Sequence, residues 1–206
     1  GLPYRDLLAG LFLAGIRNIK PHPVGFKFHA VMVVNSAHVL GQSAAVEDRL
    51  LPALWALDNF KNSQAQDVKE GDWTLARVDE SRLPSPAKAE SEFLRAMEAW
   101  DAQAADAAVA ALCRNSGAAG TMEPLWRMAV RDQRNIGHKP IFAMQSWRTL
   151  QAIGWQHAEP VLRSLAFGLL DLHGDSRPVP VGPYESNLES AKKVRADWPQ
   201  GKPDPA

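Results

Sequence analysis

The chain has 206 residues, of which 46% are hydrophobic and 22% are charged, so it is long enough to enclose the core of one globular domain. Its 23 basic and 23 acidic residues give a formal net charge of zero. That balance disfavours the basic surface used by nucleic-acid-binding and membrane-surface proteins, and we expect no nucleic-acid partner.

A single cysteine, Cys113, excludes an intrachain disulfide and a cysteine-based metal cluster. It lies in an alanine-rich stretch, where we expect it to be a small apolar helix residue. The longest apolar run, residues 7–16, is too short to cross a bilayer, so we expect a soluble protein without a transmembrane segment. Because the chain starts at Gly1, the sequence is compatible with a cytoplasmic location and with export after removal of an N-terminal segment.

Helical periodicity dominates the sequence and strand signals are almost absent, which predicts an all-α fold of seven to eight helices in a compact bundle. Residues 66–86 are the least helical interior stretch, and we expect an ordered loop there with an extended piece over residues 73–78. Thr121 is a plausible N-cap for the helix that follows it. The predicted helices cover residues 4–18, 26–40, 46–66, 86–115 (two helices or one bent helix), 121–135, 140–153 and 156–172.

The C-terminal segment differs from the rest of the chain, because six of the fifteen prolines lie after residue 173. We expect a single all-α domain over residues 1–173 and an extended Pro-rich tail over residues 174–206, with one short helix at 185–196. Such a tail wraps its own domain or binds a protein partner.

A pattern occurs twice, about 110 residues apart, and it is the most informative feature of the sequence. The first copy begins FHAVMVVNSAHVLG and the second GHKPIFAMQSWRTLQAIGW, and in each a histidine (His29, His138) heads an apolar helical stretch that a second helix follows. Two related helical hairpins of this kind would bring the two imidazoles to one centre, within about 12 Å of each other. We therefore predict that His29 and His138 form the catalytic centre.

Helical spacing decides which other side chains join that centre. At about 100° per residue, His29 and His38 point from opposite faces of one helix unless that helix breaks near Asn35 and Ser36. Seven positions after its histidine, each copy carries a small polar residue on the matching face. These two polar residues are Ser36 and Gln145.

A metal site would have to be assembled from residues distant in sequence, because no HExxH or related ligand string is present. The candidate ligands are His29, His38, His138 and His157, with the carboxylates of Asp58, Asp67 and Glu159. The alternative is that the histidines are buried, hydrogen-bonded core residues.

Seven tryptophans are a high number for this length, and two of them lie on apolar helical faces near the second histidine. Trp147 and Trp155 could wall a pocket for a flat cofactor, with Arg148 meeting a ligand carboxylate. A transition metal or a non-covalent haem would suit such a pocket. Core packing is the alternative role for the tryptophans.

The strings FHAVMVVNSAHVLG and GHKPIFAMQSWRTL resemble the histidine-headed helical segments of the questin oxidase-like family. Known members of that family are oxidases that cleave or oxygenate polycyclic aromatic substrates. The resemblance implies that His29 and His138 line the substrate or oxidant site.

Two functional hypotheses follow from the sequence. The first is an oxidoreductase-type domain with a histidine-centred metal, haem or aromatic-substrate site in a Trp-lined helical pocket. The second is a non-catalytic helical subunit or docking domain of a larger complex, with structural histidines and a tail that binds a partner.

Overall fold

The structure is a computed structural model that describes residues 1, 3–172, 177 and 182–194. Throughout this part of the chain it contains helices and no strands, so the all-α prediction is confirmed. The described residues form ten α-helices rather than the seven to eight predicted, because two predicted helices are each divided in two and a helix lies in the tail. The α-helices are α1 (Tyr4–Asn18), α2 (His29–Met32), α3 (Val34–Ser43), α4 (Leu51–Glu70), α5 (Ala89–Ala99), α6 (Ala102–Asn115), α7 (Ala118–Val130), α8 (His138–Ile153), α9 (Ala158–Leu169) and α10 (Gly182–Val194).

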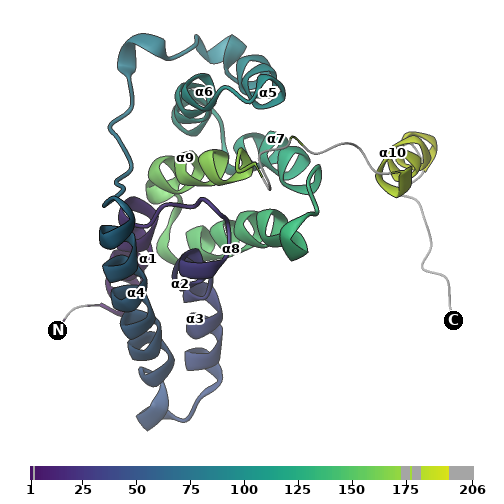
Figure 1. Ribbon diagram of the computed structural model, residues 1–206. Coiled ribbons are helices and arrows are strands. Elements are labelled where there is room, and N and C mark those ends of the chain that lie inside the picture. Colours follow the sequence, from purple (N-terminus) through teal and green to yellow (C-terminus); the bar gives the residue numbers. More distant parts are fainter. Residues whose placement is uncertain (2, 173–176, 178–181, 195–206) are drawn as a thin grey trace, which may run out of the picture.

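Helix α9 occupies the middle of the fold. It packs against α6 on one side and α8 on another, and α1 contacts α4, α8 and α9 (Figure 1). Nine of the twelve residues of α9 are buried, and they include the polar residues Arg163 and Ser164 as well as apolar side chains. The core is continuous through these helices.

The helix predicted over residues 26–40 is divided in two places. Residues Phe26–Phe28 form a single 3-10 turn, η1, and a turn at Val33 then separates α2 from α3. The break is thus at Val33 and not at Asn35 and Ser36. Three valines within four positions restrict side-chain rotamers along this stretch, which weakens a continuous helix.

The predicted N-cap at Thr121 is wrong. Helix α7 begins at Ala118 with Gly117 as its N-cap, and Thr121 lies buried inside the helix. The Thr121 hydroxyl donates to the carbonyl of Gly117 at 3.1 Å, so its side chain bonds back along the helix. The alanines after Gly117 favour helix strongly enough to start it a turn earlier.

Residues 72–79 are neither helix nor strand, in agreement with the middle of the predicted loop, but residues 66–70 at its start belong to α4. The 72–79 segment is tied to α1 by a hydrogen bond from the Leu75 amide to the Arg17 carbonyl at 2.9 Å.

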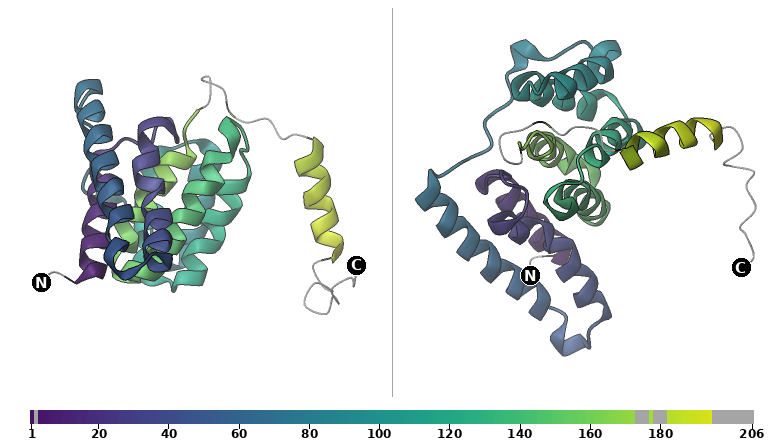
Figure 2. Two further views of the ribbon diagram at one scale, coloured as in Figure 1. Left: turned by 90° about the horizontal axis from the view of Figure 1, so that it is seen from below. Right: turned by 45° about the vertical axis from the view of Figure 1, so that its right-hand side comes forward.

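Helices α3 and α4 pack together and project away from the other helices as a hairpin (Figures 1 and 2). Their connection contains a second 3-10 turn, η2 (Val46–Asp48).

Helix α10 lies apart from the other helices in Figure 1 and in the left-hand view of Figure 2. It replaces the short helix predicted at 185–196 and starts three residues earlier, at Gly182. The other expectations for the tail concern residues 173–176, 178–181 and 195–206, which lie outside the described part. No helix among the described residues is both long and apolar enough to cross a membrane.

Candidate functional site

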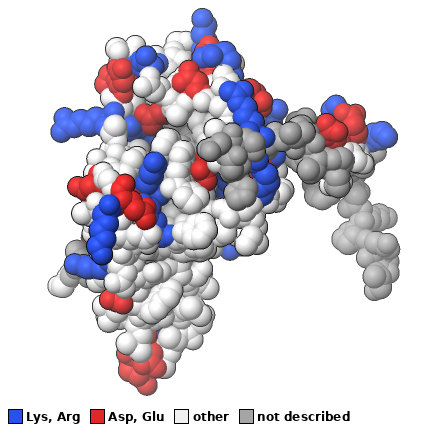
Figure 3. All heavy atoms as spheres, in the orientation of Figure 1, with Lys and Arg blue, Asp and Glu red and all other residues white. Residues whose placement is uncertain are grey.

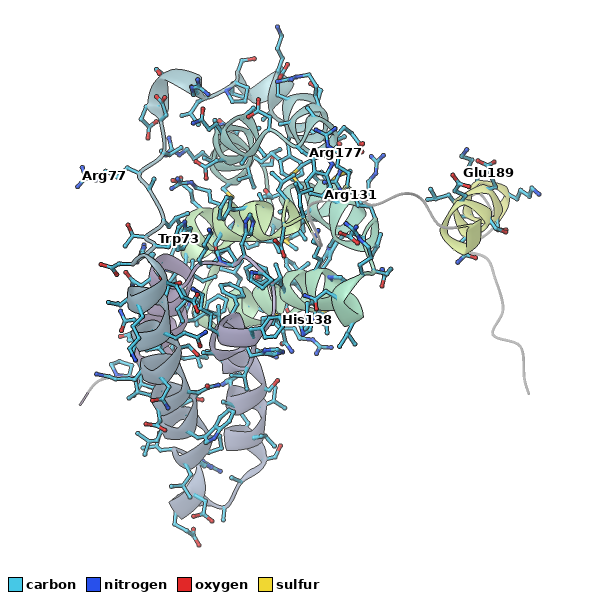
Figure 4. The ribbon with its side chains drawn as sticks, in the orientation of Figure 1. Trp73, Arg77, Arg131, His138, Arg177 and Glu189 are labelled. Atoms are coloured by element: carbon cyan, nitrogen blue, oxygen red, sulfur yellow. The ribbon has the colours of Figure 1, made fainter. Side chains whose placement is uncertain are left out.

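The two histidines that head the repeated pattern are in direct contact. The Nε2 atom of His29 lies 3.0 Å from the Nε2 atom of His138, and the two rings meet edge to face at 80°. Figure 4 shows His138 where α8 runs next to α2. The predicted proximity of the two imidazoles is confirmed.

Both histidines are held by the same local structure. His29 follows the 3-10 turn η1 and begins α2, and His138 follows the 3-10 turn η5 (Asn135–Gly137) and begins α8. In each case the ring Nδ1 donates to the carbonyl three residues earlier, from His29 to Phe26 at 2.8 Å and from His138 to Asn135. The repeat seen in the sequence is therefore a repeat of hydrogen bonding as well.

The turns that precede the histidines interlock. The side-chain amide of Asn135 donates to the Val24 carbonyl at 2.8 Å. Gly25 lies against the His138 imidazole, and a Cβ built on Gly25 would be 3.4 Å from that ring. Since Gly25 also has φ +130°, only glycine suits both the backbone and the close approach. The turns thus hold the pair in place from both sides.

Two apolar side chains project from these turns into solvent. Phe26 has φ +47° and is 73% exposed, while Ile136 has φ +59° and is 89% exposed. Bulky residues rarely adopt this left-handed backbone, and a β-branched residue such as isoleucine adopts it least readily. The sequence analysis did not identify either residue, and only the glycines at positions 25 and 137 hinted at special backbone there.

Below the histidine pair, α2, α3 and α8 are joined by one aromatic and one polar contact. Phe28 meets Phe142 edge to face, with ring centroids 4.6 Å apart in the buried core. The side chain of Asn35 donates to that of Gln145 at 2.9 Å. Gln145, seven positions after His138, thus pairs with Asn35, the residue before Ser36.

A buried lysine lies beside each histidine in the sequence, and each is bound to a buried aspartate. Lys27 Nζ is 2.5 Å from Asp67, and Lys139 Nζ is 2.7 Å from Asp132. Burial alone raises the pKa of both aspartates. Hydrogen bonds to the carboxylates outweigh the effect of burial, and the pKa of each aspartate is lowered. Asp67 accepts hydrogen bonds from Lys27 and from the backbone amides of residues 20 and 73. Asp132 accepts hydrogen bonds from Arg134 and Lys139. Both lysines are therefore engaged away from the histidine pair.

The hydrogen bonds define which ring nitrogens are left for other partners. A carbonyl oxygen can only accept, so the Nδ1 atoms of His29 and His138 both carry a hydrogen. The two Nε2 atoms, 3.0 Å apart, are therefore the atoms through which the pair can share a proton or a metal ion.

The other predicted metal ligands do not join the pair. His38 contacts the Tyr4 hydroxyl at 3.2 Å through Nδ1, and burial lowers the pKa of His38. His157 ends the 3-10 turn η6 (Trp155–His157), and both ring nitrogens of His138 are already engaged elsewhere. Within the described part of the chain, no three or more His, Cys, Asp or Glu side chains are placed to hold a metal ion. The proposed four-histidine set is thus not assembled.

The proposed carboxylate ligands also have other roles. Asp67 holds Lys27 and the backbone amides of Lys20 and Trp73. Glu159 accepts from Arg114, at 2.7 Å, in a surface ion pair. Asp58 is exposed on α4.

The tryptophans proposed to wall a cofactor pocket pack on one another. Trp147 meets Trp126 and Trp155 edge to face, with centroids 6.5 Å and 6.1 Å apart, and all three rest against the core. Trp147 is nine residues after His138 on α8, about two and a half turns away on the opposite side of the helix. Arg148 is exposed. These contacts fit core packing better than a cofactor wall at the histidine pair.

No protein-family model, curated protein or solved structure matches this chain.

Proposed function

We propose that this chain is an oxidoreductase-type domain whose centre is the His29–His138 pair, and that the two Nε2 atoms hold a divalent transition-metal ion. The observation that carries the proposal is the arrangement of the two rings. Both Nδ1–H groups are fixed on backbone carbonyls, and the two Nε2 atoms lie 3.0 Å apart. Metal-binding histidines in proteins are commonly oriented in this way by a carbonyl on the other ring nitrogen.

The separation of the two nitrogens favours particular metals. With metal–nitrogen bonds of about 2.0–2.1 Å, a 3.0 Å nitrogen separation corresponds to a ligand–metal–ligand angle of roughly 95°. Adjacent positions at such an angle are typical of tetragonal Cu(II) and Ni(II). A haem iron between two axial imidazoles needs its two nitrogens about 4 Å apart, across the macrocycle. The pair therefore fits a transition metal and does not fit a bis-histidine haem.

A centre with two protein ligands leaves several coordination positions for substrate or water, as catalytic metal sites do. Bound copper would supply one-electron chemistry and polarise a coordinated oxygen. His29 and His138 would hold the ion, and the carbonyls of Phe26 and Asn135 would fix the orientation of the rings. The resemblance of the two histidine segments to the questin oxidase-like family supports an oxidant or substrate site at the same residues.

Metal titration of the purified chain tests this proposal. Cu(II) or Ni(II) should bind with a stoichiometry of one. Both His29→Ala and His138→Ala should abolish binding while the helical circular dichroism is retained. His38→Ala is the matched control, because His38 lies on α3 against Tyr4, and it should bind like wild type. Equal metal affinity in all four proteins would contradict the proposal.

The docking-domain hypothesis is supported by a different part of the fold. The α3–α4 hairpin exposes several large apolar side chains, among them Leu40, Leu54 and Trp55, which are each more than half exposed. Figure 3 shows that end of the molecule as a mainly uncharged surface with an acidic tip. Apolar patches of this kind mark interaction sites. A groove of about 300 Å³ between α1 and α4 adds a concave apolar surface.

We propose that α10 of a second copy of this chain is the occupant in this second hypothesis. Helix α10 lies apart from the other helices, exposes Leu188, and ends in two lysines that complement the acidic turn η2. Analytical ultracentrifugation should then show dimers at micromolar concentration, and Leu54→Glu and Leu188→Glu should each dissociate them. A wild-type chain that stays monomeric over this range would exclude the arrangement.

A further inference from the structure

We infer that a cavity between the 72–79 segment, α6 and α9 binds a small molecule that carries one planar aromatic ring and one carboxylate. The cavity has a volume of about 470 Å³, which is within the usual range for pockets that enclose a small organic ligand. The described residues that line it come from 73–82, α6 and α9, and the His29–His138 pair is not among them. The cavity is therefore a second site, and it does not depend on the proposed function.

Aromatic rings form one wall of the cavity. The Trp73 ring is parallel to the Phe167 ring, at an interplanar angle of 4° with centroids 5.8 Å apart, and Phe167 also stacks on His22 at 4.0 Å. Both Trp73 and Phe167 line the cavity, and neither is fully buried. Figure 4 shows Trp73 at the start of the loop, next to α9. A planar ring in the cavity would extend a stack that already exists, since aromatic pairs prefer offset parallel or edge-to-face arrangements.

A buried guanidinium provides the polar end of the cavity. Arg163, on α9, is only 6% exposed. Its Nε and Nη2 atoms donate to the Asp106 carboxylate at 2.8 Å and 2.9 Å, and Nη2 also donates to the Ala76 carbonyl at 2.8 Å. Its Nη1 atom makes no hydrogen bond with the described residues, although Arg163 lines the cavity. Because a guanidinium has five N–H donors and binds carboxylates well, these spare donors suit a ligand carboxylate.

Gln103 adds a neutral donor beside this guanidinium. It lies three residues before Asp106 on α6, so the two side chains share one face of the helix, and both line the cavity. The Gln103 carbonyl oxygen accepts from Arg82 at 2.9 Å. Within the described part of the chain its amide NH2 group has no acceptor, so this group can also donate to a ligand.

The charge of the lining favours a ligand with one negative charge. Three arginines and two aspartates line the cavity, which leaves an excess of one positive charge. Arg163 is paired with Asp106, and Arg82 lies 3.5 Å from Asp79. Arg77 extends from the loop into solvent (Figure 4) and forms no ion pair with the described residues. A carboxylate balances this excess, whereas a phosphate monoester carries about −1.5 to −2 at neutral pH.

Four matched ligands test the inference on the full chain. Hydrocinnamate has the ring and the carboxylate, cyclohexanepropionate lacks the aromatic ring, hydrocinnamamide lacks the charge, and phenethyl phosphate carries more charge. Binding would be followed by fluorine NMR of the chain labelled with fluorotryptophan, and Trp73→Phe identifies the Trp73 signal. Hydrocinnamate should shift that signal. It should bind about tenfold more tightly than the amide and about threefold more tightly than cyclohexanepropionate. Phenethyl phosphate should bind no more tightly than hydrocinnamate.

Two variants test the two ends of the cavity separately. Gln103→Glu changes an exposed side chain, so the fold should be retained, and the added negative charge should weaken hydrocinnamate about tenfold while hydrocinnamamide is nearly unaffected. Gln151→Glu is the matched control, because Gln151 is an exposed glutamine of α8 that does not line the cavity, and it should bind like wild type. Trp73→Leu should remove the preference for hydrocinnamate over cyclohexanepropionate while the helical circular dichroism is retained.

Several outcomes would overturn the inference. Wild type could fail to bind hydrocinnamate at millimolar concentration, or could bind it no more tightly than its amide. Tighter binding of phenethyl phosphate would assign the cavity to phosphate ligands. A Trp73 signal that stays fixed while hydrocinnamate binds would place the ligand elsewhere, and equal weakening in Gln103→Glu and Gln151→Glu would show a general effect of charge. None of these measurements involves a metal ion, so they are independent of metal binding by the histidine pair.

Discussion

At the scale of single residues, the hydrogen bonds to Nδ1 decide what the histidine pair can do. Each Nδ1 atom is committed to a carbonyl within its own turn, and Nε2 is the atom left for chemistry. A buried core histidine would usually engage both nitrogens with unrelated partners. Here the two remaining lone pairs meet each other, which is why one proton or one metal ion can be held between them.

Asn135 should contribute to this arrangement through its backbone and its side chain. It has φ +56°, which asparagine tolerates better than alanine, and its amide bonds the Val24 carbonyl. We expect Asn135→Ala to lower the free energy of unfolding by about 1–2 kcal/mol and to weaken metal binding about tenfold or more. Asn135→Gly keeps the backbone conformation and should lose less in both measurements, which are urea unfolding and metal titration. Equal losses in the two variants would show that φ is unimportant there.

Cys113 should be chemically inert in the folded protein. Burial is the main cause that raises the pKa of its thiol, to about 12, and the nearby carboxylate of Glu159 adds to it. Since the thiolate is the reactive form, a disulfide reagent at pH 8 should modify the native chain far more slowly than the urea-unfolded chain. Rapid stoichiometric reaction of the folded protein would contradict this and assign Cys113 a reactive role.

At the scale of elements, the features that could be predicted from the sequence are the local ones. The helix of residues 4–18 follows from apolar spacing alone, and its observed bounds are Tyr4–Asn18. The His29–His138 contact was predictable because one short pattern occurs twice. The break at Val33 and the early start of α7 could not be predicted from the sequence, because small differences in the helix propensity of neighbouring residues decide where a helix begins or breaks.

Long-range contacts explain the rest of the difference between prediction and structure. The sequence offered four histidines, but spacing along the chain says nothing about His38 packing on Tyr4 from another helix. The turns that carry Phe26 and Ile136 acquire their importance only when they meet in space. The sequence offered both core packing and a pocket wall for Trp147, and its contacts with Trp126 and Trp155 decide between them.

The start of α8 should depend strongly on one buried ion pair. Lys139 donates to the Asp132 carboxylate and to the Asp171 carbonyl, and Asp132 is almost fully buried. Lys139→Ala leaves the Asp132 carboxylate with Arg134 as its remaining charged partner and should cost about 1–3 kcal/mol in urea unfolding. The double variant Lys139→Met/Asp132→Asn removes both charges and should recover most of the loss. If the double variant is as unstable as the single one, packing and not charge is responsible.

At the scale of the whole molecule, the position of α10 makes the tail separable from the domain. Helix α10 lies apart from the helices that share the core (Figure 2), and the described side chains from Glu185 to Lys193 are all exposed. A chain that ends at residue 173 should keep the helical circular dichroism of α1–α9 and nearly the same melting temperature. Loss of cooperative unfolding on truncation would show that the tail stabilises the domain.

The response of the whole fold to acid follows from its buried titratable groups. Burial is the main cause that lowers the pKa of His22 and of His38, so the unfolded chain binds protons at these sites more readily than the folded one. A histidine with a lowered pKa contributes stability that is present above its unfolded value of about 6.5 and is lost as the pH falls below it. Asp67 and Asp132 contribute stability that is lost only further down, as the pH falls below the ordinary aspartate value of about 4 toward their lowered pKa values.

We therefore expect the free energy of unfolding to fall in two stages on acidification. The first loss should begin near pH 6.5, and a steeper one should begin near pH 4, where each of the two aspartates adds about 1.4 kcal/mol per pH unit. Urea unfolding between pH 3 and pH 8 measures both stages. His38→Phe should reduce the first stage alone and Lys139→Met/Asp132→Asn the second alone, because each variant removes a group that titrates in one range. A single stage in wild type, or a second stage that the double variant leaves unchanged, would show that Asp132 does not determine the acid stability of the fold.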